Sequence, residues 1–525
     1  MPTTPPTARS ATVKRRTVLG AAGAMAAVPA TAALTTRAAT AASRAPSAPV
    51  FDRADHTAVT ETITTDSGDK EVTYHFYGPL TYVTRPSDAT HQSLVISVPV
   101  AIDGTPVDAS DAPIVLANGV GGYFPSSVAN ANGVGQASME TGGGGTPGGP
   151  GGPGGPGGGK MVSIPRLALA AGYVVAEPGA RGRSLTDANG RYYGTAPAAI
   201  VDLKAAVRYL RANKGRVPGN PERIVSTGTS AGGALSSLLG ASGDSRLYAP
   251  YLKEVGAAEA SDAVFAAGAW CPITDLEHAD MSYEWCWGGN VTRATGAPVD
   301  RTVSRELTAA FADHQASLRL KAKGYGTVKA SNLDDYILRT YLQPAATRYL
   351  AALTETARTS YLTANPFITW SGGRATFSWQ DFTAHVGPRK KGAPAFDAFD
   401  LSAGENNEFG AGTTAARHFT LYSLRQDTGS SSSRLDSDIP EKLASMNPMY
   451  HIARKNPSRS KHWWFRVGTD DTDSSPVIVS NLALALENLG DDVNPLMYWD
   501  EGHGANIDAA AFLGWIAKVT GHKGR

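Results

Sequence analysis

A serine flanked by glycines joins a predicted strand to a predicted helix near the middle of this 525-residue chain. The pentapeptide Gly-Thr-Ser-Ala-Gly occupies residues 228–232, after the strand-like run 223–227 and before the small-residue run 233–240. Strand, tight turn and helix are the setting in which G-x-S-x-G forms a nucleophile elbow. The glycines let the two backbones approach closely, where a Cβ would clash. The pattern therefore predicts Ser230 as an exposed nucleophile, with the Ala231 N–H facing a developing oxyanion.

Strand-like and helix-like segments alternate on both sides of this turn, which favours a mostly parallel sheet covered by helices on both faces. Together with the elbow, this order predicts an α/β-hydrolase fold. The expected strands are 93–100, 113–117, 172–177, 223–228, 263–270, 462–467 and 495–499. The expected helices among them are 199–213, 233–240, 477–489 and 508–519.

The alternation stops between about residues 272 and 446, where helices are expected only over 306–322 and 334–349. An insertion that caps the strand ends explains this better than an independent domain, because ligands bind at the carboxyl ends of parallel strands. The expected organisation is a first core part over 43–270, an inserted lid over 271–446 and a second core part over 447–525.

The first residues predict export. Lys14, Arg15 and Arg16 precede a mild apolar run, which is the pattern of a bacterial twin-arginine signal peptide within residues 1–42. That run is mostly Ala and Gly and is broken by Pro29, so it is a poor membrane-spanning helix. We therefore expect a secreted protein with no membrane contact after cleavage.

Residues 141–160 are nearly all Gly and Pro, which predicts a disordered surface loop with no chemical role. Over the whole chain the charges balance, with 48 basic and 47 acidic residues. This balance excludes a field that would attract nucleic acid or an anionic membrane. The two cysteines, Cys271 and Cys286, lack the spacing of a zinc site. Export permits a disulfide between them, although we favour two buried free thiols. No metal or organic cofactor is expected.

A serine nucleophile needs a base, and α/β-hydrolases supply the triad in the order Ser, Asp, His. Three of the histidines that follow the expected insertion are considered for this role. His462 lies inside a strand pattern and His451 lies near the end of the insertion, whereas His503 lies in a Gly-flanked loop just after a strand. We therefore predict His503 as the base.

The acid should follow the strand before that one, and three aspartates do so: Asp470, Asp471 and Asp473. Their spacing alone does not choose among them, and at least one suits a solvated turn or a helix N-cap. A second oxyanion donor usually comes from a glycine-rich loop after an early strand. Gly119 and Gly121 are the candidates there.

Several blocks of sequence together resemble bacterial tannases, the tannin acyl hydrolases that cleave galloyl esters. The likeness runs from about residue 93 to the C-terminus. Several blocks lie in the expected insertion, where generic hydrolases share nothing, so the resemblance is more specific than the elbow. The blocks are 228–235, 270–276, 279–285, 391–397, 402–407 and 468–473, ahead of His503.

Carried over by position, the resemblance implies that Ser230, Asp471 and His503 form the catalytic triad. The residues that it implies for gripping the galloyl ring are Lys391, Glu405 and Asp473. Two carboxylates and an ammonium can satisfy three vicinal hydroxyls, and an acyl group lacking those hydroxyls would leave buried charges unpaired. The expected partner is a small phenolic ester.

Three other functions fit parts of the pattern. A feruloyl or general aryl carboxylesterase would have the same fold and catalytic residues but a different acyl pocket. A prolyl-type serine peptidase shares the elbow and triad order, but the chain has no β-propeller repeat. A catalytically inactive scaffold that binds polyphenols would not need serine, aspartate and histidine in this order.

Overall fold

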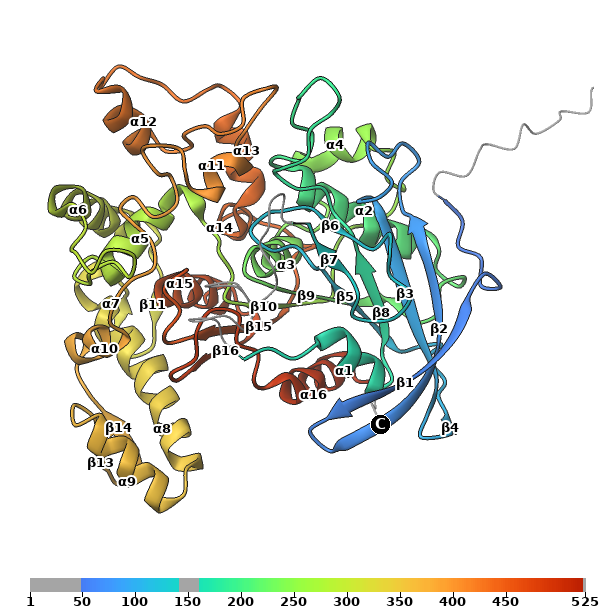
Figure 1. Cartoon of the computed structure of the whole chain (residues 1–525), viewed down its shortest axis with the longest axis horizontal. Coiled ribbons are helices and arrows are strands. Elements are labelled where there is room, and N and C mark those ends of the chain that lie inside the picture. The colour runs from blue at the N-terminus through green and yellow to red at the C-terminus, as the bar shows by residue number, and fades with distance from the viewer. Residues whose placement is uncertain (1–48, 141–159, 523–525) are drawn as a thin grey trace, which may run out of the picture. The chain divides into compact units, whose positions relative to one another are not determined.

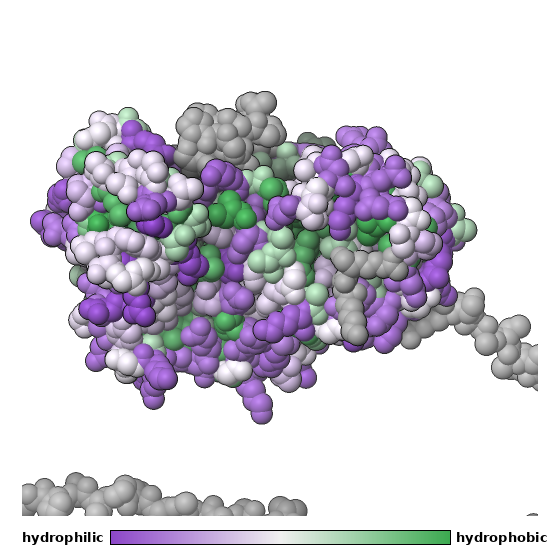
Figure 2. All heavy atoms as spheres, turned by 90° about the horizontal axis from the view of Figure 1, so that it is seen from below, coloured by the Kyte–Doolittle hydropathy of each residue, from purple (hydrophilic) through white to green (hydrophobic). Residues whose placement is uncertain are grey.

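The computed structural model describes residues 49–140 and 160–522, which belong to one compact unit. The expected signal peptide and all but the last residue of the Gly/Pro-rich segment lie outside the described residues. Within the described part of the chain, no helix is long and apolar enough to cross a membrane. The face drawn in Figure 2 is mostly polar, and its apolar residues form small separate groups.

A sheet of ten strands forms the centre of the fold, in the order β1-β2-β3-β8-β5-β9-β10-β15-β16 with β4 beside β3 (Figure 1). From β8 to β16 every neighbouring pair is parallel. The strands are β1 (Thr57–Thr65), β2 (Gly68–Thr81), β3 (Ser93–Ile102), β4 (Thr105–Pro106), β5 (Pro113–Ala117), β8 (Val174–Pro178), β9 (Asn220–Thr229), β10 (Ala266–Trp270), β15 (His462–Gly468) and β16 (Asp492–Tyr498). This is an α/β-hydrolase fold, as the sequence predicts.

Helices cover both faces of the parallel part. The crossover from β5 to β8 moves along the sheet in the opposite direction to those from β8 to β9 and from β9 to β10. Right-handed crossovers therefore place α1 on one face and α2 and α3 on the other. The helix α16 packs on α1. The core helices are α1 (Ile164–Ala170), α2 (Ala198–Ala212), α3 (Ala231–Ala241), α4 (Ala249–Glu254), α15 (Pro476–Glu487) and α16 (Ala509–Thr520).

The edge of the sheet at β1, β2 and β3 differs from the expectation. These strands pair antiparallel, and β3 is also antiparallel to β8, so the expected strand 93–100 does not continue the parallel series. The strands β1 and β2 have no counterpart among the expected elements. In β1 only Ile63 is buried, so its sequence lacks the apolar alternation that marks a half-buried strand.

Residues 271–461 separate β10 from β15 and carry most of the remaining helices, which lie to one side of the sheet in Figure 1. The expected helix 306–322 is α6, which begins at residue 301 because Asp300 caps the N–H groups of Thr302 and Val303. The expected helix 334–349 is interrupted by the π turn η2 (Leu338–Leu342), just before Pro344, which has no N–H to donate. The helices are α5 (Leu276–Trp287), α6 (Arg301–Ser317), α7 (Ala330–Ile337), α8 (Gln343–Ala352), α9 (Glu355–Ala364), α10 (Trp379–Val386), α11 (Gly404–Glu408), α12 (Leu421–Thr428), α13 (Ile439–Met446) and α14 (Pro448–Ile452).

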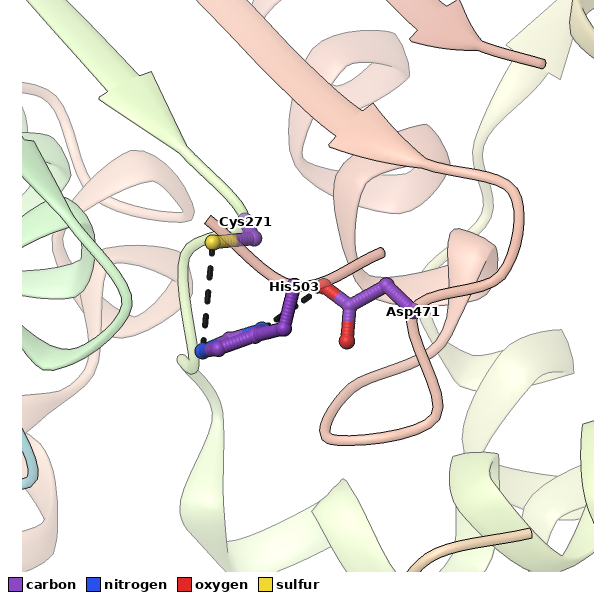
Figure 3. A group of neighbouring side chains, drawn as sticks. All are labelled: Cys271, Asp471 and His503. Atoms are coloured by element: carbon purple, nitrogen blue, oxygen red, sulfur yellow. Dashed lines mark hydrogen bonds and ion pairs between the residues drawn. The ribbon is translucent and has the colours of Figure 1, made fainter. Parts of the chain in front are cut away.

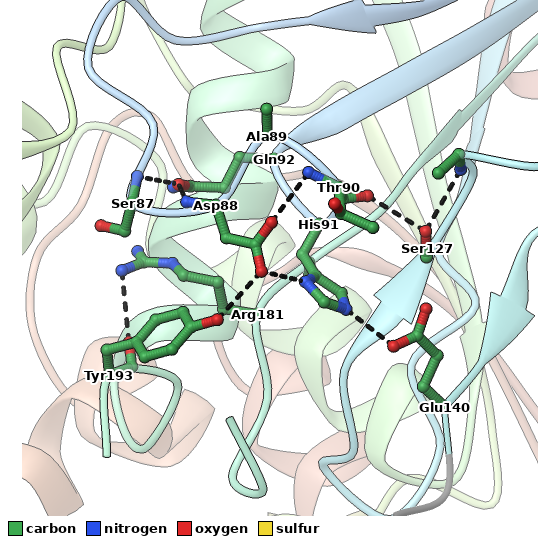
Figure 4. A network of polar contacts seen from close by, with 12 residues as sticks. Ser87, Asp88, Ala89, Thr90, His91, Gln92, Ser127, Glu140, Arg181 and Tyr193 are labelled. Carbon is green, nitrogen blue, oxygen red and sulfur yellow. Dashed lines mark hydrogen bonds and ion pairs between the residues drawn. The ribbon is translucent and has the colours of Figure 1, made fainter. Parts of the chain in front are cut away.

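A polar network anchors the chain just beyond the glycine-rich loop that follows β5 (Figure 4). His91 lies between two carboxylates, with Nδ1 2.8 Å from Asp88 Oδ2 and Nε2 3.0 Å from Glu140 Oε2. Tyr193 donates to the same oxygen of Asp88 at 2.9 Å, and Ser127 donates to the Thr90 carbonyl at 3.1 Å. Because Ser127 belongs to β6 (Ser126–Ser127), these bonds fix the far end of the glycine-rich loop.

Candidate active site

Ser230 lies in a strained turn between β9 and α3, with φ 60° and ψ −122°. A Cβ on Gly228 would lie 2.3 Å from the Gly232 carbonyl oxygen, and a Cβ on Gly232 would lie 2.6 Å from that of Val120. Both positions therefore require glycine. The Ser230 N–H donates to the Trp270 carbonyl at 2.9 Å, which ties the turn to the end of β10. Backbone strain of this kind is found where a side chain must be presented for function.

Three of the expected site residues form one continuous chain of contacts. His503 Nε2 lies 2.9 Å from Ser230 Oγ, and His503 Nδ1 lies 2.9 Å from Asp471 Oδ2. The Asp471 carboxylate is fully buried, and its other oxygen accepts the N–H groups of Asp473 and Ser474. The three side chains follow the carboxyl ends of β9, β15 and β16, and Figure 3 shows His503 between Asp471 and Cys271.

The contact with Asp471 has an electrostatic consequence for the imidazole. Burial by itself lowers the pKa of His503, because a charged ring loses its hydration. The Asp471 carboxylate, together with a smaller contribution from Cys271, more than offsets this, and the pKa of His503 lies well above its usual value. The Asp471 contact also selects the tautomer with a proton on Nδ1, which leaves Nε2 to accept the serine proton.

The other histidines and the other aspartate considered for these roles lie elsewhere. His451 is buried against the Tyr248 hydroxyl at 3.1 Å, and burial lowers its pKa to about 3. His462 pairs with Asp492 at 3.0 Å. Burial, with a smaller contribution from a neighbouring carboxylate, raises the pKa of Asp470 to about 6. None of these residues contacts Ser230.

The expected oxyanion donors border the elbow. Ala231 is the first residue of α3, so its N–H has no acceptor within the helix. The Asn118 side chain donates to the carbonyls of Thr227 and Gly232 at 3.0 Å each, which holds the start of the glycine-rich loop against the turn. The loop that contains Gly119 and Gly121 therefore lies beside the N-terminus of α3.

The expected ring-binding residues form two separate ion pairs. Lys391 Nζ lies 3.4 Å from Glu405 Oε1 and 3.7 Å from the centre of the Phe396 ring. Both Lys391 and Glu405 line a cavity of about 500 Å³, whose lining does not include Ser230 or Asp473. Asp473 pairs instead with Lys390, whose Nζ lies 2.6 Å from Oδ1. Sequence reasoning missed Lys390, because nothing distinguishes it within the basic run 389–391.

A buried ion pair holds the backbone that carries these lysines. Arg389 and Glu284 of α5 are both fully buried and make two contacts, one of them at 2.9 Å. The same guanidinium donates to the carbonyls of Lys391 at 2.8 Å and Gly392 at 2.6 Å. Arg389 therefore fixes the local backbone from which Lys391 extends.

Cys271 and Cys286 are both buried free thiols, as favoured from the sequence. Cys271 Sγ lies 3.9 Å from His503 Nε2 (Figure 3). Cys271, Asp471 and His503 lie close enough to surround one ion. However, both nitrogens of His503 already contact Asp471 and Ser230, so an ion bound to either nitrogen would displace one of these contacts.

Comparison with known proteins gives consistent matches. The BD-FAE family model, an esterase domain, matches residues 160–308. The structure of a tannase from Fusobacterium nucleatum has 34% sequence identity and a TM-score of 0.73, and the match covers 90% of this chain and 99% of that one. Two structures of a tannin acyl hydrolase have 31% identity and cover 90% of this chain and 98% of their own. One is a complex with 3,4-dihydroxybenzoate (TM-score 0.75) and the other with ethyl gallate (0.73). No curated protein matches the chain.

Proposed function

This chain belongs to the bacterial tannase family, and we propose that it hydrolyses galloyl esters as a serine esterase whose nucleophile is Ser230. That it is a carboxylic ester hydrolase follows from its relatives. The observation that carries the finer proposal is the chain of contacts from Ser230 through His503 to Asp471, at 2.9 Å for each step. This geometry allows one proton to move from the serine to the imidazole.

The reaction has two halves. In the first, Ser230 Oγ attacks the ester carbonyl while neutral His503 takes its proton at Nε2, and Asp471 stabilises the imidazolium that forms. The tetrahedral oxyanion is held by the Ala231 N–H and by an N–H of the loop after β5. His503 then protonates the departing alcohol. In the second half, water attacks the acyl-enzyme with the same base, which releases gallate and restores the serine.

We assign the acyl specificity to Lys391, Glu405 and Asp473. The first two line the cavity of about 500 Å³, and Asp473 lies two residues beyond the triad acid, which brings it close to His503. One ammonium and two carboxylates match the donor and acceptor capacity of three adjacent phenol hydroxyls. Related proteins of known structure bind 3,4-dihydroxybenzoate and ethyl gallate, which supports a small phenolic ligand. Sites of this kind reject a deoxygenated analogue by roughly 10⁴-fold.

The inserted segment and the leader complete the proposal. The segment 271–446 supplies Lys391 and Glu405, and we propose that it acts as the lid over the strand ends. The twin-arginine pattern lies outside the described residues, and we propose that it directs export of the folded enzyme.

Two measurements test this function. A fluorophosphonate probe should label the wild-type protein at Ser230 and should not label Ser230→Ala. The same variant should lose at least about 10⁴-fold of its methyl gallate hydrolysis, because the covalent route is removed. Activity of Ser230→Ala within tenfold of wild type would contradict the mechanism. Comparable rates on methyl ferulate and methyl gallate would instead favour a general aryl carboxylesterase.

A further inference from the structure

One arginine side chain connects the two parts of the site that the proposed reaction uses. Arg183 lies in the loop that follows β8, and its Nε donates to the Gly122 carbonyl at 2.7 Å. Its Nη1 donates to Asn407 Oδ1 at 3.0 Å. Gly122 is the last residue of the oxyanion loop (residues 118–122), and Asn407 belongs to α11, which also carries Glu405. A single guanidinium therefore joins the oxyanion loop to the helix proposed to bind the acyl ring.

The end of the oxyanion loop has a conformation that needs this support. Gly122 and Tyr123 both have a left-handed backbone, with φ 53° and 57°. Such a backbone is costly for tyrosine and persists only where the surrounding contacts impose it. Arg183 binds both carbonyls, since its backbone N–H donates to that of Tyr123 at 2.9 Å. Loss of the side chain would therefore release one of the contacts that hold the loop end.

The other end of the bridge reaches the acyl cavity. Gly404 and Glu405, the first two residues of α11, both line the cavity of about 500 Å³. A Cβ on Gly404 would lie 3.0 Å from Arg183 Nη2, so the guanidinium lies directly against this turn of the helix. The same loop also bonds the end of α11, because the Ala196 N–H donates to the Glu408 carbonyl at 2.8 Å. The position of Glu405 therefore depends on the loop that carries Arg183.

Two different nitrogens of Arg183 make the side-chain bonds, and both acceptors are uncharged. Its Cζ also lies 3.9 Å from the centre of the Phe124 ring. Burial lowers the pKa of Arg183, and the carboxyls of Glu408 and Glu405 offset this only in part. A lysine has a single nitrogen on a flexible stem, so it would keep the charge but lose the fixed spacing between the two acceptors. The arrangement therefore depends on the planar fork of arginine.

We propose that Arg183 is a positioning residue that sets the distance between the oxyanion donors and the acyl cavity. This role rests on the proposed function, because it takes the galloyl ring to bind beside Lys391 and Glu405. In a galloyl ester the reacting carbonyl is bonded directly to the ring, so the two sites can be occupied together only at one separation. A misplacement of about 1 Å can cost about 100-fold in rate. Arg183 acts through the loop and the helix and does not contact the substrate.

Two substitutions separate the two ends of the bridge. Arg183→Met removes both side-chain contacts, and should lower kcat by about tenfold or more on both p-nitrophenyl acetate and methyl gallate, because an oxyanion donor moves. It should also raise KM for methyl gallate. Asn407→Leu removes only the contact with α11, and should raise KM for methyl gallate by about threefold or more, as expected for one hydrogen bond. Its turnover of p-nitrophenyl acetate should change by less than about twofold. Arg183→Lys should resemble Arg183→Met.

Asn407→Asp and Arg85→Met are the controls. Asn407→Asp keeps an acceptor for Arg183 and loses only the bond from Asn407 Nδ2 to the Ala415 carbonyl, so its KM should stay close to that of wild type. Arg85 also donates through Nε to a backbone carbonyl, that of Glu254 at 3.0 Å, on another part of the protein. Arg85→Met should therefore change neither kcat nor KM. Titration with a fluorophosphonate probe gives the concentration of active enzyme. A loss of folded protein alone would lower that concentration and leave KM unchanged.

The outcomes of these measurements are distinct. An unchanged kcat or an unchanged KM for methyl gallate in Arg183→Met would overturn the proposal, since the bridge requires both to change. A KM that stays at the wild-type value in Asn407→Leu would also overturn it. If circular dichroism shows that Arg183→Met does not fold, the same two constants in Arg183→Lys decide. A wild-type enzyme that hydrolyses p-nitrophenyl acetate but not methyl gallate would instead contradict the galloyl specificity, a result separate from any change caused by these substitutions.

Discussion

Lys390 Nζ lies 2.6 Å from Asp473 Oδ1, so the carboxylate expected to meet the substrate already has a cationic partner from the inserted segment. Burial by itself raises the pKa of Asp473, but His503 and Lys390, with a smaller contribution from Lys391, outweigh it, and the net pKa lies below the usual value. The pair therefore keeps Asp473 ionised as a hydrogen-bond acceptor. It also links the inserted segment to the loop that carries the triad acid.

Removal of this partner should weaken substrate binding. In Lys390→Met the pKa of Asp473 rises, and KM for methyl gallate should increase by about fivefold, which corresponds to the upper end of what a partly exposed ion pair contributes. Lys390→Arg should retain most of the affinity. Lys461→Met is a matched control, because Lys461 forms a comparable pair with Asp491 at 3.1 Å, on another part of the protein. An unchanged KM in Lys390→Met would show that the ion pair does not contribute to substrate binding.

The acyl preference should depend on Lys391 and Glu405. We expect Lys391→Met and Glu405→Gln each to reduce kcat/KM for methyl gallate by at least about 100-fold, since each leaves a phenol hydroxyl without its charged partner. Turnover of p-nitrophenyl acetate should change by less than about fivefold, because that substrate has no ring hydroxyls. Steady-state rates on both substrates test this. A gallate preference that persists in both variants would refute the assignment.

Activity should fall on the acid side at an unusually high pH. Catalysis needs neutral His503, and the pKa of that imidazole lies above its usual 6.5, so kcat/KM should rise with pH through an apparent pKa greater than 6.5. A pH profile with p-nitrophenyl acetate avoids ionisation of substrate phenols. In Asp471→Asn the residual activity should show a lower apparent pKa, because the attracting carboxylate is gone. A wild-type plateau that extends below pH 6 would contradict the expectation.

The buried pair of Arg389 and Glu284 should be critical for stability. Glu284→Gln leaves a fully buried guanidinium without its counter-charge, and should lower the free energy of unfolding by about 3–5 kcal/mol. Urea denaturation measures this. The control is Asp335→Asn, which breaks an exposed pair with Arg339 and should cost less than about 1 kcal/mol. Equal effects of the two substitutions would mean that the buried pair has no special role.

The elbow should tolerate no side chain at position 232. A Cβ there would lie 2.6 Å from both Asn118 Oδ1 and the Val120 carbonyl oxygen, so Gly232→Ala should displace the oxyanion loop. We expect a loss of at least about 100-fold in kcat, the usual scale for an oxyanion donor. Gly514→Ala in α16 meets no neighbouring atom and should leave kcat unchanged. A wild-type value of kcat in Gly232→Ala would show that the loop after β5 can shift without loss of catalysis.

Much of this structure was predictable because its strongest signals are local. The elbow, the buried parallel strands and the loop position of His503 each depend on a short stretch of sequence. The edge strand β1 was not predictable, because a strand with only Ile63 buried has no apolar period. The neighbouring strand β2 does have one, at Val72, Tyr74 and Phe76, and sequence reasoning missed it. The role of Lys390 was also not predictable. Its partner Asp473 lies 83 residues away, and nothing in the run of three basic residues indicates which of them forms that ion pair.

The residues proposed for recognition and those proposed for chemistry come from different stretches of the gene. Ser230, Asp471 and His503 follow strands of the sheet, whereas Lys391 and Glu405 lie in the stretch between β10 and β15. Recombination that exchanged this stretch between relatives would supply a new acyl pocket to an intact reaction centre. Asp473 limits that freedom, since it lies between β15 and α15, outside the exchanged stretch, and needs a lysine from that stretch as its partner.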